Sequence, residues 1–287
     1  MTVANGEASS DLLDDSDITR TVRIALDEDI GSGDLTATLL PDEEATARVV
    51  CRDEAIICGR HWFDKVFAIL DPDIQVDWLI QEGERAGPGQ TICQLRGKAR
   101  ALVSGERTAL NFLQTLSGVA TLVRQYVNAV QGTHTRVLDT RKTLPGLRKA
   151  QKYAVCCGGG YNHRIGLYDG ILIKENHIHA AGSVCAALEQ ARSQDSQGCM
   201  IEVEVEDMDQ LREAVNCNAT RVLLDNFPVE LLPAAVTEAG NELETEVSGN
   251  VDLTNIREIA DTGVNYISVG ALTKNIAAID LSMRFVN

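Results

Sequence analysis

The sequence predicts an α/β protein in which an antiparallel α+β unit precedes a parallel sheet that closes wholly or partly into a barrel. In the first part, short strand-like runs are joined by turn residues, which is typical of antiparallel strands. In the second part, each strand-like run precedes a helical pattern, and this alternation is typical of βα units. A length of 287 residues predicts one large or two modest domains. A doubly wound sheet is the alternative, but no GxGxxG motif follows an early strand.

The first element that the sequence predicts is a helix. Residues 1–15 are small, polar and acidic, and we expect them to be flexible. Ser16 or Asp17 is expected to cap a helix that runs to about Asp29, because apolar residues recur there at helical spacing. The two glycines in EDIGSGDLTA (28–37) end this helix.

Short strands follow from Ala45 onwards, and a long helix follows the strands. The strand-like runs are TARVVCR, AIICGR, IQVDWLI and TICQLRG, and one helix, HWFDKVFAIL, interrupts them. Residues 99–130 have the pattern of a long helix, and no low-complexity linker separates the two parts. We therefore expect the domain boundary in or near this helix.

The second part contains the strands of the predicted barrel. Strand-like runs occupy residues 136–140, 170–175, 200–206, 221–226, 243–249 and 265–270. The last four begin about 20 to 22 residues apart, and a helical pattern follows each. Six or seven units of this period predict a complete or open α/β barrel.

The composition excludes several classes of function. Lys and Arg number 26 against 42 Asp and Glu, and the resulting charge of −16 disfavours binding to nucleic acid or to anionic membranes. No signal peptide is visible, and no run approaches the roughly 18 apolar residues of a membrane span. These features predict a cytoplasmic protein. The 8 cysteines form no CxxC pair, and we expect them to be reduced and mostly buried.

Polar side chains end five of the six predicted barrel strands, and Gly270 and Ala271 end the sixth, at the positions where barrel enzymes carry their active sites. The clearest concentration of charge is basic, because residues 139–175 contain seven Lys and Arg and only three acids. Guanidinium groups match carboxylates and phosphates, so this segment predicts a site for a multiply anionic ligand. We interpret Arg148, Lys149 and Lys152 differently, as the solvated face of a helix at 147–156.

Two further patterns point to phosphate and to a divalent cation. EVSGN and SVGAL place small residues between a strand and a helix in the last two units, where backbone N–H groups can face a phosphate. Glu204 and Asp225 lie at the ends of neighbouring strands, and carboxylates beside an anionic ligand favour a bridging Mg²⁺. Glu202 and Glu206 share the alternation of Glu204, so the spacing does not decide which of the three is the ligand.

Several motifs resemble those of the quinolinate phosphoribosyltransferase family, also called nicotinate-nucleotide pyrophosphorylase (carboxylating). The longest is LDTRKTLPGLRKAQKYAVCCGGGYNHRIGLYDGILIKENHI (138–178). The others are EDIGSGDLTA (28–37), GERTALNFLQTLSGVAT (105–121), VEVE (203–206), LLDN (223–226), EVSGN (246–250) and ISVGALT (267–273). The similarity covers nearly the whole chain from about residue 17.

The resemblance implies a fold, a reaction and an assembly. The fold is an N-terminal α/β sandwich domain (16–130, with a helical linker region at about 99–130) and an open, TIM-like α/β barrel (131–275), with 276–287 returning to the first domain. The reaction converts quinolinate and phosphoribosyl pyrophosphate, with Mg²⁺, to nicotinate mononucleotide, pyrophosphate and CO₂ in NAD biosynthesis. The assembly is a homodimer whose active sites are shared between subunits; whether dimers assemble further is left open.

The resemblance also implies roles for individual residues. The two carboxylates of quinolinate would contact Arg141, His163 and Arg164, together with Arg107 of the partner subunit. The remaining implied residues line the quinolinate pocket (Thr140), the phosphoribosyl pyrophosphate side (Lys142, Lys174), the ribose and Mg²⁺ (Glu204, Asp225) and the 5′-phosphate (Ser248, Gly249, Asn250, Val269, Gly270, Ala271). Lys142, Lys174, Glu204 and Asp225 are the implied catalytic residues.

Two positions depart from the family pattern, since many relatives have glycine at Asn250 and histidine at Lys274. Both departures adjoin the phosphate site and leave the reaction itself in place. Two other functions remain alternatives: a related enzyme that uses another acid, such as nicotinate, and a non-catalytic phosphate-binding protein. The basic residues implied for quinolinate disfavour the first, and the presence of Glu204 and Asp225 disfavours the second.

Overall fold

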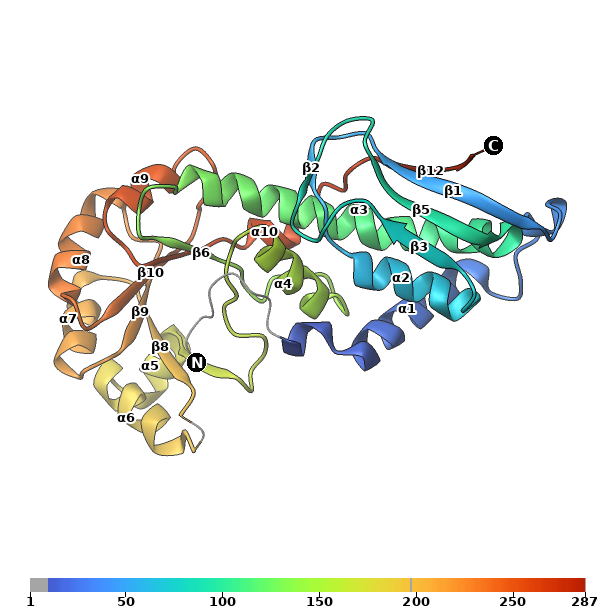
Figure 1. The fold of residues 1–287 in the computed structure, drawn as a ribbon. Coiled ribbons are helices and arrows are strands. Elements are labelled where there is room, and N and C mark those ends of the chain that lie inside the picture. Colours follow the sequence, from blue (N-terminus) through green and yellow to red (C-terminus); the bar gives the residue numbers. More distant parts are fainter. Residues whose placement is uncertain (1–9, 197, 287) are drawn as a thin grey trace. The chain divides into compact units, whose positions relative to one another are not determined.

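The structure is a computed structural model that describes residues 10–196 and 198–286. These residues form two compact units, each with its own sheet (Figure 1). The antiparallel unit comprises residues 10–124, 143–159 and 272–286, and the parallel unit comprises residues 125–142 and 160–271. Residues 1–9 of the segment predicted to be flexible lie outside the described residues, whereas Ser10–Leu13 form a short 3-10 helix and Asp15 begins an α-helix.

The antiparallel unit contains a four-stranded sheet covered by helices. Its strand order is β12–β1–β5–β3, and every neighbouring pair is antiparallel. The strands are β1 (Glu44–Cys51), β3 (Gln75–Trp78), β5 (Thr91–Lys98) and β12 (Leu281–Val286), with a separate pair β2 (Ala55–Ile56) and β4 (Arg85–Ala86). The helices are η1 (Ser10–Leu13), α1 (Asp15–Ile30), η2 (Ala37–Leu39), α2 (Arg60–Leu70), α3 (Ala99–Ala129, which continues into the parallel unit), α4 (Arg148–Cys157) and α10 (Ala271–Lys274).

Apolar side chains of α2 form part of the core of this unit. Phe63 packs edge to face against Phe67 and Trp78, and Phe63 and Phe67 are fully buried. Helix α1 begins close to its predicted position, and its cap is Asp14, whose side chain accepts the N–H of Ser16 at 3.3 Å. The predicted α+β character of this part is therefore confirmed.

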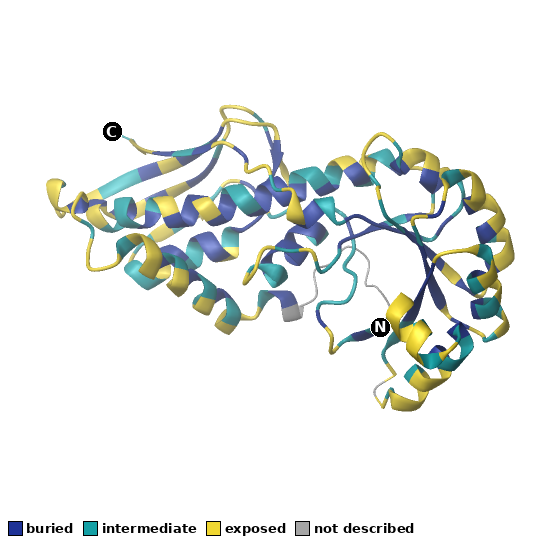
Figure 2. Cartoon of the chain, turned by 180° about the vertical axis from the view of Figure 1, so that it is seen from behind, coloured by how far each residue is buried: buried dark blue, intermediate teal, exposed yellow. Residues whose placement is uncertain are grey.

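The parallel unit is an open α/β barrel, as predicted. Its six strands have the order β6–β11–β10–β9–β8–β7, all pairs are parallel, and the described residues show no pairing between β6 and β7. The strands are β6 (Arg136–Leu138), β7 (Gly170–Ile173), β8 (Met200–Val205), β9 (Arg221–Asp225), β10 (Glu244–Ser248) and β11 (Tyr266–Ser268). The helices are α5 (Glu175–Ala181), α6 (Val184–Gln194), α7 (Met208–Asn216), η3 (Val229–Leu231), α8 (Leu232–Ala239) and α9 (Ile256–Asp261). Figure 2 shows buried strands lined by helices with exposed outer faces.

The division into units differs from the predicted ranges in three places. The first boundary falls between Arg124 and Gln125 inside α3, residues 143–159, which include α4, lie in the antiparallel unit, and the return to that unit begins at Leu272. The expectation that Lys152 lies on a solvated face is wrong, because its side chain is fully buried. Residues Ala150 to Val155 are all buried, whereas Arg148 and Lys149 at the start of α4 are partly exposed.

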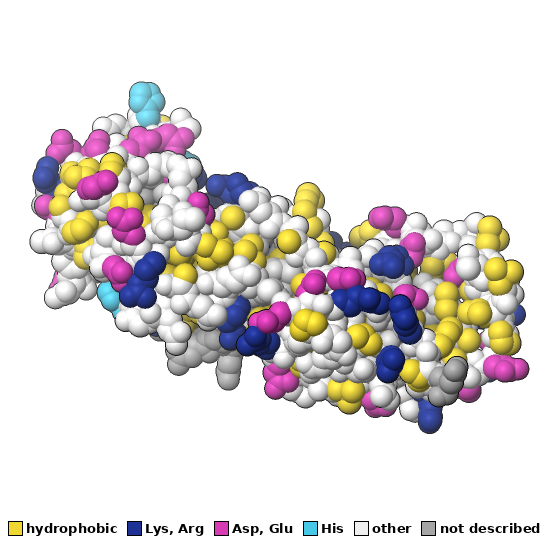
Figure 3. Space-filling view, turned by 90° about the horizontal axis from the view of Figure 1, so that it is seen from above, with side chains coloured by type: hydrophobic (Ala, Val, Ile, Leu, Met, Phe, Trp, Pro, Cys, Tyr) yellow, Lys and Arg dark blue, Asp and Glu magenta, His cyan; other side chains and the backbone are white. Residues whose placement is uncertain are grey.

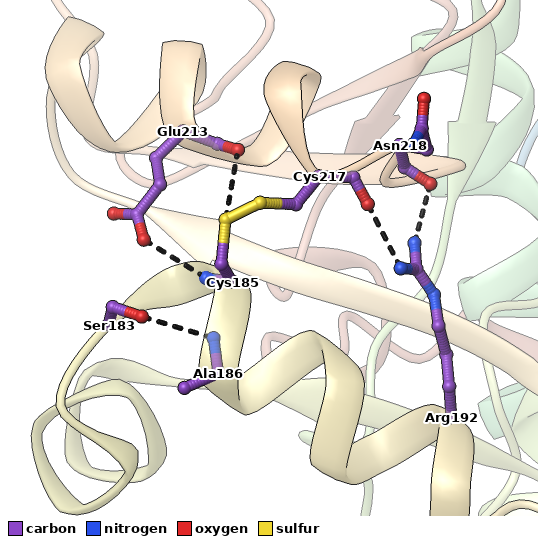
Figure 4. The surroundings of a disulfide bond; sticks show 7 residues. All are labelled: Ser183, Cys185, Ala186, Arg192, Glu213, Cys217 and Asn218. Carbon is purple, nitrogen blue, oxygen red and sulfur yellow. Dashed lines mark hydrogen bonds between the residues drawn. A yellow bond between two sulfur atoms is a disulfide. The ribbon is translucent and has the colours of Figure 1, made fainter.

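Two cysteines contradict the expectation of reduced thiols. Cys185 at the start of α6 and Cys217 at the end of α7 form a disulfide, with their Cα atoms 5.6 Å apart (Figure 4). The N–H of Cys185 donates to the carboxylate of Glu213 at 3.1 Å, which fixes the two helix ends side by side. The bond forms because adjacent βα units bring these helix ends together, which the spacing of the cysteines in the sequence does not reveal. The other six cysteines form no disulfide within the described residues, and Cys51, Cys58 and Cys93 are buried.

The surface agrees with the charge balance of the sequence. On the face shown in Figure 3, acidic side chains are spread over both units and lie among basic ones. Among the described residues, no helix is long and apolar enough to cross a membrane.

Candidate active site

The carboxyl ends of the six parallel strands bring most of the predicted site residues to one edge of the sheet. Glu204 lies on β8, Asp225 ends β9, and Ser248 ends β10 directly opposite Asp225 in the strand register. The residues that follow the ends of β6, β7, β10 and β11 are Thr140, Arg141, Lys142, Lys174, Gly249, Asn250, Val269, Gly270 and Ala271. We call these residues, with Glu204, Asp225 and Ser248, the strand-end cluster. Arg107 lies on α3 in the antiparallel unit and is not part of it.

An ion pair between neighbouring strands links a predicted base and a predicted acid. Lys174 Nζ lies 2.6 Å from Glu204 Oε2, and the Glu204 side chain is only 10% exposed. Lys174 is also the N-cap residue of α5, and its backbone N–H donates to His177 Nδ1 at 2.9 Å. This ion pair distinguishes Glu204 from the two other glutamates of this segment. Glu206 is exposed, and Glu202 is buried in another part of the unit.

Glycine is required at one position of the strand-end cluster and leaves room for a lysine at another. At Gly249, with φ +102°, an added Cβ would lie 2.2 Å from Asn226 Oδ1. At Gly270, an added Cβ would lie 3.0 Å from Cδ of Lys142, so the missing side chain leaves room for that lysine. Asn250 has φ +51°, in the left-handed region that glycine and asparagine adopt most easily. The departure from glycine at this position is therefore compatible with the backbone of the loop.

Hydrogen bonds to a buried carboxylate hold the segment that carries His163 and Arg164. Asp139, fully buried, accepts the N–H of His163 at 2.9 Å and the Asn162 side-chain amide at 2.6 Å. Arg164 Nη1 donates to the carbonyl of Gly170 at 2.9 Å. Burial and the nearby positive charge of Arg141 lower the pKa of Arg164. The charges of these two guanidinium groups therefore act on each other, and an anion bound near both would relieve the repulsion.

Beneath His163 lies a buried charge network that the sequence did not reveal, formed by His163, Glu202, Arg221 and Glu246. His163 Nε2 lies 2.8 Å from Glu202 Oε2, and Arg221 Nε donates to Glu202 Oε1 at 3.1 Å. Arg221 Nη2 also donates to Glu246, and both glutamate side chains are fully buried. The available sequence signal was charge in the middle of otherwise apolar strands, as in TEVS around Glu246.

Burial and pairing oppose each other in this network. Burial raises the pKa of Glu246 to about 7, and the negative charge of Glu202 adds to this rise. Burial alone would raise the pKa of Glu202, but hydrogen bonding to His163 and the charge of Arg221 lower it overall. Burial alone would lower the pKa of His163, but Glu202 and Glu246 raise it overall. The network therefore raises the pKa of His163, whose Nδ1 accepts the N–H of Arg164 at 2.7 Å.

Comparisons with known proteins agree with this arrangement. Residues 34–117 match the family model for the quinolinate phosphoribosyl transferase N-terminal domain, and residues 119–284 match the model for its C-terminal domain. A probable nicotinate-nucleotide pyrophosphorylase [carboxylating] of Bacillus subtilis is 42% identical over 257 residues, which is 89% of each chain. A quinolinate phosphoribosyltransferase [decarboxylating] of Nicotiana tabacum is 38% identical and covers 93% of this chain and 82% of its own. The solved nicotinate-nucleotide pyrophosphorylase of Francisella tularensis has a TM-score of 0.93 and 46% identity, covering 95% of this chain and 97% of its own.

Proposed function

Because the chain belongs to the quinolinate phosphoribosyltransferase family, we propose that it transfers the phosphoribosyl group of phosphoribosyl pyrophosphate to quinolinate. The products are nicotinate mononucleotide, pyrophosphate and CO₂, and the reaction supplies NAD biosynthesis. The observation that carries the proposal is that two family models together match residues 34–117 and 119–284, and that the charge of Arg141 lowers the pKa of Arg164. Two guanidinium groups that act on each other match the two carboxylates of a pyridine dicarboxylate.

In this proposal, the quinolinate carboxylates bind Arg141, His163 and Arg164, with Thr140 beside them. Arg107 of the partner subunit completes the pocket. A substrate with one carboxylate would leave a buried cation without its partner, so the site should discriminate strongly against nicotinate.

The phosphoribosyl pyrophosphate half of the site uses the rest of the strand-end cluster. Lys142 and Lys174 face the leaving pyrophosphate, while Glu204 and Asp225 lie beside the ribose. The 5′-phosphate binds the backbone of the two loops after β10 and β11, whose glycines permit close approach. The residues assigned to these loops are Ser248, Gly249, Asn250, Val269, Gly270 and Ala271.

Mg²⁺ fits the donor chemistry of this edge. Glu204 and Asp225 offer carboxylate oxygens, the ligands that Mg²⁺ prefers, and the phosphate oxygens of the substrate can supply others. One oxygen of Asp225 accepts the Asn226 side-chain amide at 2.8 Å, which orients the carboxylate. When bound, Mg²⁺ would neutralise charge on the departing pyrophosphate.

The chemistry requires positioning more than a reactive side chain. The bond between ribose C1 and pyrophosphate breaks, and the ring nitrogen of quinolinate forms a bond to C1. The carboxylates of Glu204 and Asp225 stabilise the positive charge that develops on the sugar. The resulting pyridinium accepts the electron pair of the adjacent carbon–carboxylate bond as CO₂ leaves, and a proton then takes the vacated ring position.

We propose a homodimer with shared active sites as the working assembly. Three large apolar side chains near the N-terminus are exposed: Ile24 at 62%, Leu35 at 86% and Leu39 at 82%. Exposed apolar side chains on this scale favour a protein partner, and a second copy would cover them. A cytoplasmic location remains part of the proposal.

The first test is product analysis with purified protein, Mg²⁺, quinolinate and phosphoribosyl pyrophosphate. We expect nicotinate mononucleotide and CO₂ in equal amounts, and little turnover of nicotinate. Arg107→Ala and Lys174→Ala should each be inactive alone, and mixing them should restore activity, because some mixed dimers contain one intact site. Comparable turnover of nicotinate, or no product from folded dimers, would contradict the proposed substrate.

A further inference from the structure

A second cluster of potential ligands lies in the antiparallel unit and shares no residue with the strand-end cluster. Cys58 lies between β2 and α2, Glu82 lies in the turn before β4, and Cys157 is the last residue of α4. Their two sulfur atoms and one carboxylate oxygen all lie within 4.8 Å of one another. We call these three residues the thiol–carboxylate cluster. They are distant in the sequence, so the fold itself brings them together.

The backbone around each member of this cluster is held in place. The Glu82 carboxylate accepts the N–H of Gly59 at 3.0 Å and of Arg60 at 2.8 Å. The Cys58 N–H donates to Ser117 Oγ at 2.9 Å, and this hydroxyl in turn donates to the Cys58 carbonyl at 3.1 Å. Metal-binding side chains are commonly oriented by such outer hydrogen bonds. The cluster is therefore ordered without a ligand.

Arg124 fixes the third member of the cluster. Its Nε donates to the carbonyl of Gly158 at 2.8 Å, next to Cys157 at the end of α4. The other nearby arginine, Arg60, donates from Nη1 to the carbonyl of Ile80 at 3.1 Å and to the side chain of Gln81 at 3.0 Å. Among the described contacts, neither guanidinium hydrogen-bonds to a side chain of the thiol–carboxylate cluster.

The electrostatics of the cluster favour an added cation. Burial, followed by the proximity of Cys157 and Glu82, raises the pKa of Cys58. Burial raises the pKa of Glu82 to about 7, although two backbone N–H groups and the charge of Arg60 oppose the rise. Burial and the charge of Glu82 also raise the pKa of the neighbouring Tyr153. A cation bound among these acidic groups would offset the cost of their burial.

The cluster is also accessible. A cavity of about 330 Å³ opens beside Glu82 and Cys157 and is large enough for a hydrated ion. Gly83, Tyr153 and Cys156 line the same cavity. A cation could therefore reach the ligands without unfolding the unit, and a water molecule could occupy a remaining coordination position.

We propose that Cys58, Cys157 and Glu82 form a binding site for a thiophilic divalent cation of the Zn²⁺ class. Two thiolates and one carboxylate match the ligand preferences of Zn²⁺ and disfavour Mg²⁺, which requires oxygen ligands. Binding releases the protons of both thiols and any proton held by Glu82, so affinity rises with pH. The cation stabilises the antiparallel unit by joining α4 to the segments before α2 and β4.

The test is Zn²⁺ and Cd²⁺ titration of the full chain after chelator treatment, in the absence of substrates. We expect one tight site per chain by calorimetry and a thiolate-to-Cd²⁺ charge-transfer band in the ultraviolet. Cys157→Ser should lower the affinity by about 100-fold or more, since even a lost outer-shell partner costs about 10–100-fold. Cys156→Ser is the matched control, because Cys156 is the neighbouring thiol of the same cavity.

The folding of each variant must be checked before affinities are compared. Cys58→Ser alters a fully buried position, so thermal unfolding should first show that each variant is folded. Zn²⁺ should raise the Tm of the wild type and of Cys156→Ser but not that of Cys157→Ser. Absence of tight binding to the folded wild type, or equal affinities in Cys157→Ser and Cys156→Ser, would overturn the proposal. Because no substrate is present, these results are independent of the proposed transferase activity.

Discussion

Arg221 offers the sharpest test of the buried charge network, because it compensates two fully buried carboxylates at once. The substitution Arg221→Met preserves much of the side-chain volume and removes the charge. Glu202 would then retain His163 as a partner, while Glu246 would lose its closest cation. Removing one partner of a buried ion pair costs about 3–5 kcal/mol, because the remaining charge stays buried without compensation.

We therefore expect Arg221→Met to lower the free energy of unfolding of the parallel unit by about 3–5 kcal/mol. Two units need not unfold together, so urea unfolding should be followed by hydrogen exchange at the amides of β8, β9 and β10. Adding Glu246→Gln in the same chain should recover part of the loss, because it removes the carboxylate left unpaired.

The matched control is Arg212→Met. Arg212 pairs with Asp209 at 2.7 Å and lies 3.6 Å from Glu238, but its side chain is 52% exposed. Exposed pairs contribute about 0–1 kcal/mol, so this variant should unfold nearly as the wild type does. The reasoning would be refuted if both arginine variants lost the same small amount, or if Glu246→Gln made the Arg221 variant less stable still.

Three further outcomes are expected. The folded pKa of Glu246, about 7, exceeds its ordinary value of 4.5, so the folded state binds more protons than the unfolded state between these pH values. The free energy of unfolding should therefore fall as the pH rises from about 4.5 to about 7. For Glu246→Gln, the urea midpoint should depend less on pH. Gly249→Ala would place a Cβ 2.2 Å from Asn226 Oδ1 at φ +102°. The resulting strain of about 1–3 kcal/mol should displace the loop and raise KM for phosphoribosyl pyrophosphate about tenfold. An unchanged KM would argue against a role of this loop in phosphate binding. Cys185→Ser should lower stability by about 3–4 kcal/mol, given the separation of 32 residues from Cys217, and a reductant should have this effect on the wild type but not on the variant.

The barrel and the edge that carries the strand-end cluster could be predicted from the sequence. The regular spacing of apolar runs predicts parallel strands, and their carboxyl ends must meet at one edge, whatever the details of packing. The residue types at those ends, such as Lys174 and Glu204, then indicate the chemistry. Periodicity and residue type are local properties, so a single chain is enough to reveal them.

The features that could not be predicted depend on contacts between distant segments. Lys152 has the spacing of a surface residue on its own helix, but contacts from outside that helix bury it completely. The pairing of Arg221 with Glu202 and Glu246 requires three neighbouring strands in a fixed register. The Cys185–Cys217 disulfide likewise depends on the placement of two helix ends. The alternation of polar and apolar residues along one strand does not predict any of these contacts.

The pairing of β12 with β1 has a consequence for the order of events during synthesis. β1 is translated early, but its partner at residues 281–286 leaves the ribosome after every other described element. Until then, the sheet of the antiparallel unit has an unpaired β1 edge, and such edges invite association with other chains. The parallel unit, by contrast, has all its strands available before β12 is made. We therefore expect the nascent chain to complete its barrel first, and to need protection of the β1 edge until the final strand closes it.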